Sequence, residues 1–85
     1  MTAYRVFIAA EVVTSLRTSP KREQEALVRL FEDLAADPRR SGDYVEPDSI
    51  GRPIQVLIFG RHEVCFWTDH AVKEVKILDL KRAGR

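Results

Sequence analysis

Apolar and polar positions alternate most clearly in the C-terminal third of the chain. Three runs rich in β-branched and aromatic residues, Ile54–Phe59, Val64–Thr68 and Lys73–Leu80, are separated by the short segments Gly60-Arg61 and Asp69–Val72. Glycine at the first central position of a two-residue loop is typical of a type II′ hairpin turn. Strand-like runs joined by short turns predict an antiparallel meander.

Turn geometry sets the expected register of this meander. The first turn pairs Leu57 with Val64, and a four-residue second turn pairs Phe66 with Val75. Since a one-residue slip would turn every side chain over, a buried face fixes the register. The apolar face predicted in this way consists of Leu57, Val64, Phe66, Val75 and Ile77.

The opposite face of the meander also carries apolar residues. Ile54 and Val56 lie on it in the first strand, and Cys65 and Trp67 lie on it in the middle strand. A sheet with one face in water alternates more cleanly than this. We therefore expect the chain or a partner to cover part of this second face. We predict that Ile54, Val56 and Trp67 are partly exposed there, because exposed apolar patches usually mark interaction sites.

The N-terminal half predicts one strand and two helices. The strand is Tyr4–Ala9, and a short helix follows at Ala10–Arg17. In Ser19-Pro20, serine is the expected N-cap of a second helix and proline its first residue. Asp37-Pro38 ends that helix, because the residue before proline is disfavoured in the α conformation. Helical spacing gives it an apolar stripe of Leu27, Leu30, Phe31 and Leu34.

The remaining segment, Arg39–Pro53, is polar and predicts a long loop of about fifteen residues, a length at which loops are often functional. The order is strand, helix, helix, loop and three-stranded meander. It predicts an α+β fold in which a helical hairpin covers one face of an antiparallel sheet. With 85 residues in all, we expect a single domain, 1–85.

Composition and charge argue against several functional classes. Fourteen Lys and Arg against thirteen Asp and Glu give a net charge of +1 and a pI near 7.9, whereas nucleic-acid-binding domains often exceed about 9. The one cysteine, Cys65, cannot build a disulfide framework or a Cys-rich metal site. No apolar stretch approaches the ~18 residues of a membrane span, and no signal peptide is evident. We expect a cytoplasmic protein with no cofactor, no metal and no membrane partner.

Several short segments resemble the RelE/ParE superfamily of bacterial toxins. They are the strand Tyr4–Ile8, the helix end Leu34–Arg39, the hairpin Gly60–Phe66 and the terminal pair Lys81-Arg82. The resemblance implies a RelE/ParE-like α+β fold and a toxin of a type II toxin–antitoxin, or plasmid stabilisation, module. Such a toxin inhibits growth and is neutralised by an antitoxin. RelE-type members cut messenger RNA in the ribosomal A site, whereas ParE-type members inhibit DNA gyrase.

Most positions that carry RelE-type catalysis are changed in this chain. The family's hairpin tyrosine falls on His62 and its arginine on Glu63, and its strand lysines fall on Ile54 and Val56. Arg82 matches the C-terminal arginine, but no C-terminal tyrosine follows it. Electrostatic stabilisation of the transition state is usually the largest catalytic contribution. The resemblance therefore implies a ParE-like toxin without efficient ribonuclease activity.

Two sets of candidate site residues follow. Arg82 and His62 are the candidate catalytic pair, since histidine can exchange a proton near its ordinary pKa of ~6.5. A solvated basic terminus and a surface histidine beside a turn are the alternatives. The candidate partner-binding residues are Ile54, Val56, Trp67, Arg61 and Lys81.

Three functions remain open at this point. The leading one is a ParE-like toxin whose outward apolar strand residues receive an antitoxin segment. The second is a ribosome-dependent endoribonuclease that uses Arg82 and His62. The third is a non-toxic interaction domain, such as a homodimer, on the same scaffold. The expected partners are an antitoxin and a target, either DNA gyrase or the ribosome with its messenger RNA.

Overall fold

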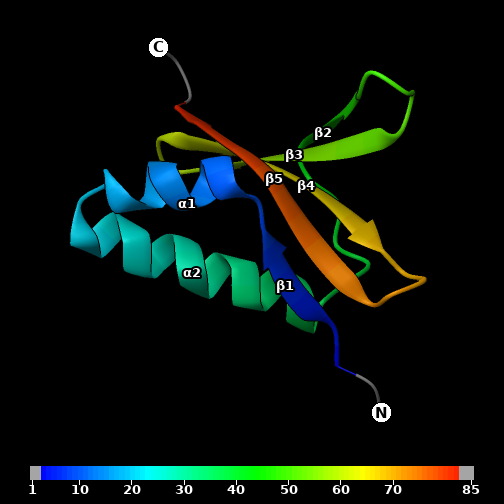
Figure 1. Ribbon diagram of the computed structural model, residues 1–85, viewed down its shortest axis with the longest axis horizontal. Coiled ribbons are helices and arrows are strands. Elements are labelled where there is room, and N and C mark those ends of the chain that lie inside the picture. The colour runs from blue at the N-terminus through cyan, green and yellow to red at the C-terminus, as the bar shows by residue number, and fades with distance from the viewer. Residues whose placement is uncertain (1–2, 83–85) are drawn as a thin grey trace.

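The computed structural model describes residues 3–82, which form two helices and a five-stranded sheet (Figure 1). The sheet order is β1-β5-β4-β3-β2, in which β1 pairs with β5 in parallel and the other neighbours are antiparallel. This confirms the α+β architecture. The elements are β1 (Arg5–Ile8), α1 (Ala10–Arg17), α2 (Lys21–Ala36), β2 (Tyr44–Pro47), β3 (Pro53–Phe59), β4 (His62–Asp69) and β5 (Glu74–Arg82).

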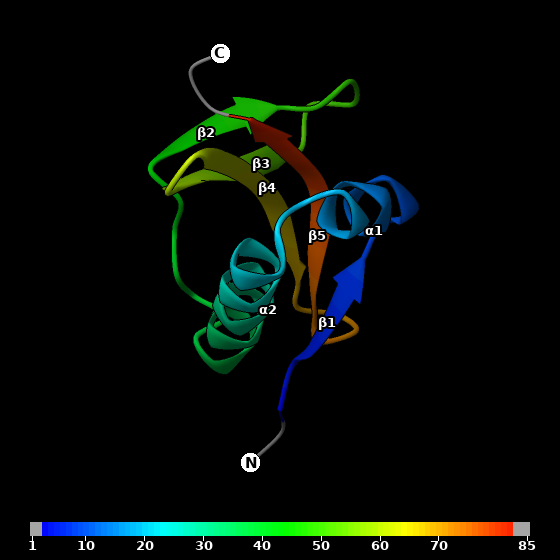
Figure 2. The same ribbon diagram turned by 90° about the vertical axis from the view of Figure 1, so that its left-hand side faces the viewer.

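Both helices lie on one face of the sheet, which we call the helix face (Figures 1 and 2). The predicted stripe of α2 and the predicted apolar face of the meander meet in one core, as expected. Phe31 is 1% exposed at its centre. The buried members of this core are Val12, Leu27, Leu30, Phe31, Leu34, Leu57, Val64, Phe66, Val75, Ile77 and Leu80.

The helix ends follow the sequence with one correction. The first helix has the predicted bounds, and α2 stops directly before Asp37-Pro38. The predicted N-cap at Ser19 is wrong, because Pro20 is the N-cap and makes no side-chain capping bond. The Ser19 hydroxyl instead donates to the carbonyl oxygen of Ser15 at 2.9 Å. Ser19 therefore satisfies a free carbonyl at the end of α1 rather than a free amide of α2.

The first hairpin has the predicted register, whereas the second is displaced. Leu57 pairs with Val64, and Gly60 has a φ of +60°, as a type II′ turn requires. In the second hairpin Phe66 pairs with Ile77 instead of Val75, so the predicted pairing was wrong by two residues. A two-residue shift keeps Val75 and Ile77 on the helix face, so the predicted core forms. Beyond the irregularity at Cys65/Phe66, Val64 pairs with Leu80, which joins that core.

The segment predicted as a long loop contains an additional strand, β2. It pairs with β3 at the edge of the sheet, and the loop before it is fixed against the same strand. Asp43 donates its backbone N–H to the Val56 carbonyl at 2.7 Å. At Gly42 an added Cβ would lie 2.5 Å from that carbonyl oxygen. The close approach of two backbones therefore requires glycine at this position.

Candidate functional site

The second face of the sheet, opposite the helices, carries its own small apolar cluster. Ile54, Val56 and Cys65 form it, and Trp67 and Leu78 pack against them. Ile54 is 8% exposed and Val56 only 1% exposed. The prediction that both are partly exposed is therefore wrong, although Trp67 is partly exposed as expected. The chain itself covers most of this face.

The cover comes from the curl of the sheet. One cleft of about 350 Å³ is lined by the segment from Glu46 to Arg52 on one side and by Leu78 and Lys81 of β5 on the other. Two strands, β3 and β4, separate β2 from β5 in the sheet order. Residues near β2 and residues of β5 can line one cleft only because the sheet bends around it. Ile54 and Cys65 also line the cleft.

Trp67 packs against the apolar cluster beside this cleft and contacts two cations. The Arg52 guanidinium carbon lies 4.9 Å from its ring centroid, and Lys76 Nζ lies 5.6 Å from it, both within the range of cation–π attraction. Asp48 accepts a hydrogen bond from Arg52 at 2.6 Å, and Asp69 accepts one from Lys76 at 3.2 Å. Each cation is thus fixed by a carboxylate on one side and an aromatic ring on the other.

These contacts shift the pKa of both carboxyl groups. For each aspartate, desolvation favours the neutral form, but hydrogen bonds to the carboxylate outweigh it. The Arg52 side chain and backbone N–H hold the pKa of Asp48 below its usual range. The hydrogen bond and the charge of Lys76 do the same to the pKa of Asp69. Both carboxyl groups therefore stay ionised at neutral pH.

Polar groups from three strands meet at the hairpin end of the second face. The Tyr44 hydroxyl of β2 donates to Glu63 Oε1 of β4 at 3.4 Å. Glu63 lies opposite Lys81 of β5 in the strand register, so the two side chains share a face. Partial desolvation and the charge of Glu63 raise the pKa of Tyr44. Sequence reasoning missed Tyr44, because its strand was predicted as loop and its face could not be assigned.

The two candidate catalytic residues lie on the other side of the sheet. His62 and Arg82 are paired across β4 and β5, so they share the helix face. Arg82 is exposed, whereas His62 is 7% exposed, so the alternative of a surface histidine is wrong. The sheet therefore separates both residues from the cleft at Ile54 and Lys81.

His62 has a partner in the first turn of α2. Its Nε2 lies 3.7 Å from Glu23 Oε1, an oxygen that is buried and accepts no hydrogen bond from the described residues. Both side chains and Arg61 line a cavity of about 240 Å³ beside the β3–β4 turn. The candidate residue Arg61 is thus placed with His62 and away from Lys81 and Trp67. This contact joins the start of α2 to the hairpin.

Cys65 is unsuited to nucleophilic chemistry. It is buried in the second-face cluster, and burial raises the pKa of its thiol above the ordinary value. The reactive form of cysteine is the thiolate, which a raised pKa disfavours at neutral pH. Cys65 is therefore a packing residue of this cluster.

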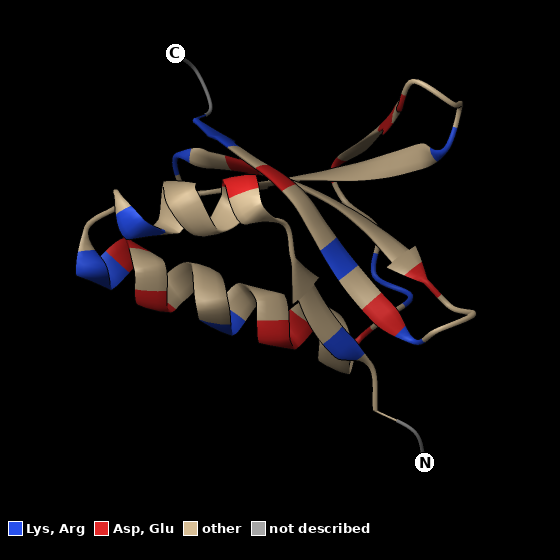
Figure 3. Cartoon of the chain, viewed as in Figure 1, with Lys and Arg blue, Asp and Glu red and all other residues tan. Residues whose placement is uncertain are grey.

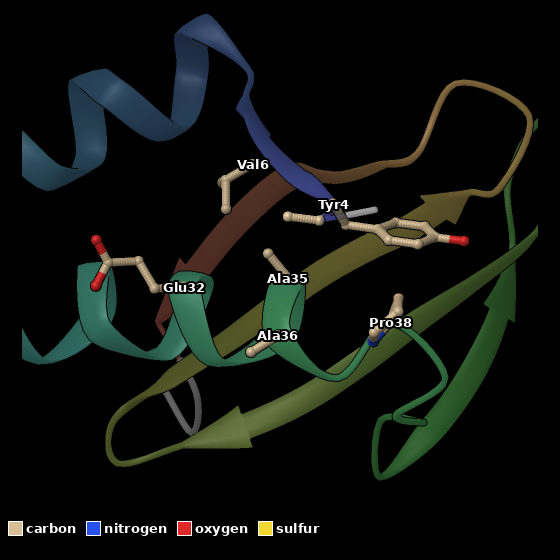
Figure 4. Close-up of a pocket in the computed structure, with 7 residues that line it drawn as sticks. Tyr4, Val6, Glu32, Ala35, Ala36 and Pro38 are labelled. Carbon is tan, nitrogen blue, oxygen red and sulfur yellow. The ribbon is translucent and has the colours of Figure 1, made fainter. Parts of the chain in front are cut away.

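A larger cavity lies away from these groups, between β1 and the end of α2. It has a volume of about 600 Å³, and Tyr4, Val6, Ala35 and Pro38 are among its walls (Figure 4). Glu32 is the charged side chain at its rim. A binding site normally combines apolar walls with several convergent polar groups. This cavity lacks them, so its size alone does not make it the candidate site.

Two further features are absent from residues 3–82. No group of three or more His, Cys, Asp or Glu side chains is placed to hold a metal ion. No helix is both long and apolar enough to cross a membrane.

Comparison with solved structures gives the fold a name. A chain of the toxin–antitoxin complex RelBE2 from Mycobacterium tuberculosis superimposes with a TM-score of 0.77, 22% identity and coverage of 95% of this chain and 99% of that one. A chain of the archaeal RelE–RelB complex from Pyrococcus horikoshii gives a TM-score of 0.79, 24% identity and 99% coverage of both. The chain has a RelE-like fold. No family model and no curated protein sequence matches it.

Within this RelE-like fold, the second sheet face has the wrong chemistry for a basic catalytic centre. Ile54 and Val56, which stand where the family resemblance implies strand lysines, are apolar and buried. Of the cations that line the cleft, Arg52 is engaged by Asp48, and Lys81 shares the cleft with Glu46 and Asp79. The arrangement is nearly neutral, with an apolar floor and an aromatic side.

Proposed function

We propose that this chain is the toxin of a toxin–antitoxin pair and acts without cleaving RNA, in the manner of ParE-like toxins. The observation that carries the proposal is the match of nearly the whole chain to chains from two toxin–antitoxin complexes. Similarity over 95% and 99% of this chain leaves little room for a separate functional unit among its residues.

Charge supports the non-nucleolytic part of the proposal. A ribonuclease of this type must concentrate positive charge where the phosphorane forms. On the second face that region carries Ile54, Val56 and Glu63, and Arg82 lies on the opposite side of the sheet. Loss of one such donor typically lowers the rate about 10²–10³-fold. Here the two strand lysines and the hairpin arginine are replaced together.

The second-face cleft is the proposed seat of the antitoxin. Its floor is apolar, Trp67 flanks it, and Lys81 stands at its rim. An apolar side chain of the partner would enter beside Ile54, while an acidic side chain would pair with Lys81. Trp is enriched among residues that dominate binding energy, because it buries a large area at low entropic cost. We therefore expect Trp67→Ala to weaken antitoxin binding more than Arg61→Ala, which lies outside the cleft.

Induced expression in a bacterial host tests the proposal. Growth should stop when the chain is expressed alone and recover when the small neighbouring gene is expressed with it. Messenger RNA extracted at the time of arrest should show no new ends in the A-site codon by primer extension. Trp67→Ala should remain toxic but escape neutralisation, whereas Arg61→Ala should be neutralised normally. Normal growth with the chain soluble and folded would refute the toxin assignment.

One observation favours a second candidate, a ribosome-dependent endoribonuclease. Tyr44, Glu63 and Lys81 lie together on the second face and provide a proton donor, a carboxylate and a cation. Such a set can perform general acid–base chemistry on a phosphodiester. A-site cleavage on programmed ribosomes that is lost in both Lys81→Ala and Tyr44→Phe, but retained in Arg82→Ala, would establish this candidate instead.

A further inference from the structure

A basic pocket lies at the end of α2 and meets the second-face cleft region at Trp67. The loop that follows α2 forms one wall, and the ends of β3 and β4 form the other. Its volume of about 300 Å³ is at the lower end of the range for small-molecule sites. We call it the α2-end pocket. It shares Pro38 with the apolar cavity of Figure 4, which extends from it toward β1.

The charge of this pocket is positive without compensation. Arg39 and Arg40 lie in its wall, and no carboxylate lines it. Figure 3 shows the basic colour on this loop. Among residues 3–82, neither arginine forms an ion pair, whereas Arg52 is held by Asp48. Two guanidinium groups without carboxylate partners make this wall an attractive site for an anion.

Hydrogen bonds fix the loop that carries the arginines. Arg40 donates its backbone N–H to the Asp37 carbonyl at 3.0 Å, which closes the turn after α2. Two residues further on, Gly42 donates its N–H to Gln55 Oε1 at 2.7 Å. The loop is thus held at both ends of the basic segment. A binding wall that is already ordered loses less entropy when a ligand arrives.

The opposite wall offers hydrogen-bond donors and planar groups. Since Gln55 Oε1 accepts the bond from Gly42, its amide NH₂ remains as a donor, and the Thr68 hydroxyl lies in the same wall. His70 shares a 2.8 Å hydrogen bond with the Tyr4 hydroxyl through Nδ1, which leaves Nε2 for another partner. Trp67, which is held by its two cations, completes this wall.

We propose that the α2-end pocket binds a small phosphate monoester, such as a nucleoside 5′-monophosphate. Arg39 and Arg40 hold the phosphate dianion, since guanidinium forks match phosphate oxygens in pairs. The planar part of the ligand lies against the His70 and Trp67 side of the pocket. This inference goes beyond the proposed toxin function. The pocket contains Trp67, which also flanks the second-face cleft, but Arg39 and Arg40 line only the pocket, and the test is binding to the isolated chain.

Trp67 makes the test direct, because it is the single tryptophan in the sequence. Its fluorescence is recorded while the chain is titrated with adenosine 5′-monophosphate, and separately with inorganic phosphate, at constant ionic strength set by sodium chloride. The test variant is Arg39→Ala/Arg40→Ala. The matched control is Arg22→Ala/Arg29→Ala, which removes the same charge from exposed positions on α2. The NMR shift of the Gln55 side-chain amide gives a second readout that does not depend on Trp67.

A saturable change in both readouts is expected for the monophosphate. Its affinity should fall about tenfold or more in the test variant and stay within about twofold in the control. Arg39→Lys/Arg40→Lys should bind with intermediate affinity, because it keeps the charge and loses the fork. Weaker binding of inorganic phosphate would assign part of the affinity to the base and ribose, and equal binding would assign the site to phosphate alone.

Three results would overturn the proposal. The first is no saturable change with either phosphate compound. The second is an equal loss of affinity in the test and control variants, which would mean that only the net charge matters. The third is binding of a short single-stranded RNA without terminal phosphates when neither small compound binds, since this would assign the arginines to a nucleic-acid surface.

Discussion

Asp48 shows at the scale of one residue how the second face is held together. One carboxylate oxygen accepts the backbone N–H groups of Ile50 and Arg52, and the other accepts the Arg52 side chain. Arg52 in turn lies over Trp67. One carboxylate therefore closes the β2–β3 turn and sets the position of a cation beside the cleft. Asp69 likewise holds Lys76 near the same ring.

These two carboxylates predict a loss of stability in acid. Their pKa values are lowered in the folded chain, so the stability they contribute is complete above the unfolded pKa of about 3.9. It is lost as the pH falls through the folded values. Asp48→Asn and Asp69→Asn should lower the urea midpoint at pH 7, and the difference from the wild type should shrink at pH 3.

The control for this prediction is Asp33→Asn, because Asp33 is an exposed carboxylate on α2 that forms no ion pair in the described part of the chain. It should change the midpoint little at either pH. A difference between Asp48→Asn and the wild type that is as large at pH 3 as at pH 7 would mean that packing, and not ionisation, is the cause.

At the scale of elements, sequence periodicity predicted the strands that alternate regularly and failed where they do not. Val75 and Ile77 are two residues apart and both face the helices, but Leu80 faces them as well. That spacing breaks the period of two and requires an irregularity, which occurs between Cys65 and Phe66 of the partner strand. The apolar spacing of Val75, Ile77 and Leu80 is present in the sequence. It would have predicted a bulge and the observed pairing of Phe66 with Ile77.

Other misses were not readable from local sequence. The edge strand β2 contains only four residues, among them Glu46 and Pro47, and such residues are uncommon in strands. The burial of Ile54 and Val56 depends on the curl of the whole sheet. Burial of His62 depends on Glu23, which is far away in the chain. Each is a tertiary effect, so the candidate site could be predicted only in part, through Trp67 and Lys81.

The helix that was predicted best gives the sharpest stability test. Phe31 is 1% exposed within the core that joins α2 to the sheet. Phe31→Ala removes most of a large buried side chain and should lower the free energy of unfolding by about 3–5 kcal/mol. Val28→Ala is the control, since Val28 lies on the outer side of the same helix and is 41% exposed.

Urea denaturation followed by circular dichroism measures both variants. The control should change stability by no more than about 0.5 kcal/mol, as most surface substitutions do. If Phe31→Ala were as mild as Val28→Ala, α2 would not pack against the sheet as described.

At the scale of the whole molecule, stability should be distributed unevenly across the sheet. The second strand from one edge, β5, is paired on both sides and lies under both helices. At the other edge β2 is paired on one side, and all four of its residues are exposed. It is held by the Asp43 contact at one end and by the Asp48 turn at the other. Elements with few buried contacts open at a lower free energy than the core.

Native-state hydrogen exchange should therefore separate the interior strands β4 and β5 from the edge strand β2. Amides of β4 and β5 that donate within the sheet should exchange only on global unfolding. Those in β2 should exchange at least about 10²-fold faster, through local opening. Asp48→Asn should speed exchange in β2 further, whereas the amides of β5 should still exchange only through global unfolding.

Opening of β2 would uncover Ile54 and Val56, which are buried when it is closed. A partner could then reach the apolar floor of the cleft without unfolding the core. If β2 amides are as protected as those of β5, the cleft is rigid, and the floor is accessible only through its mouth beside Lys81.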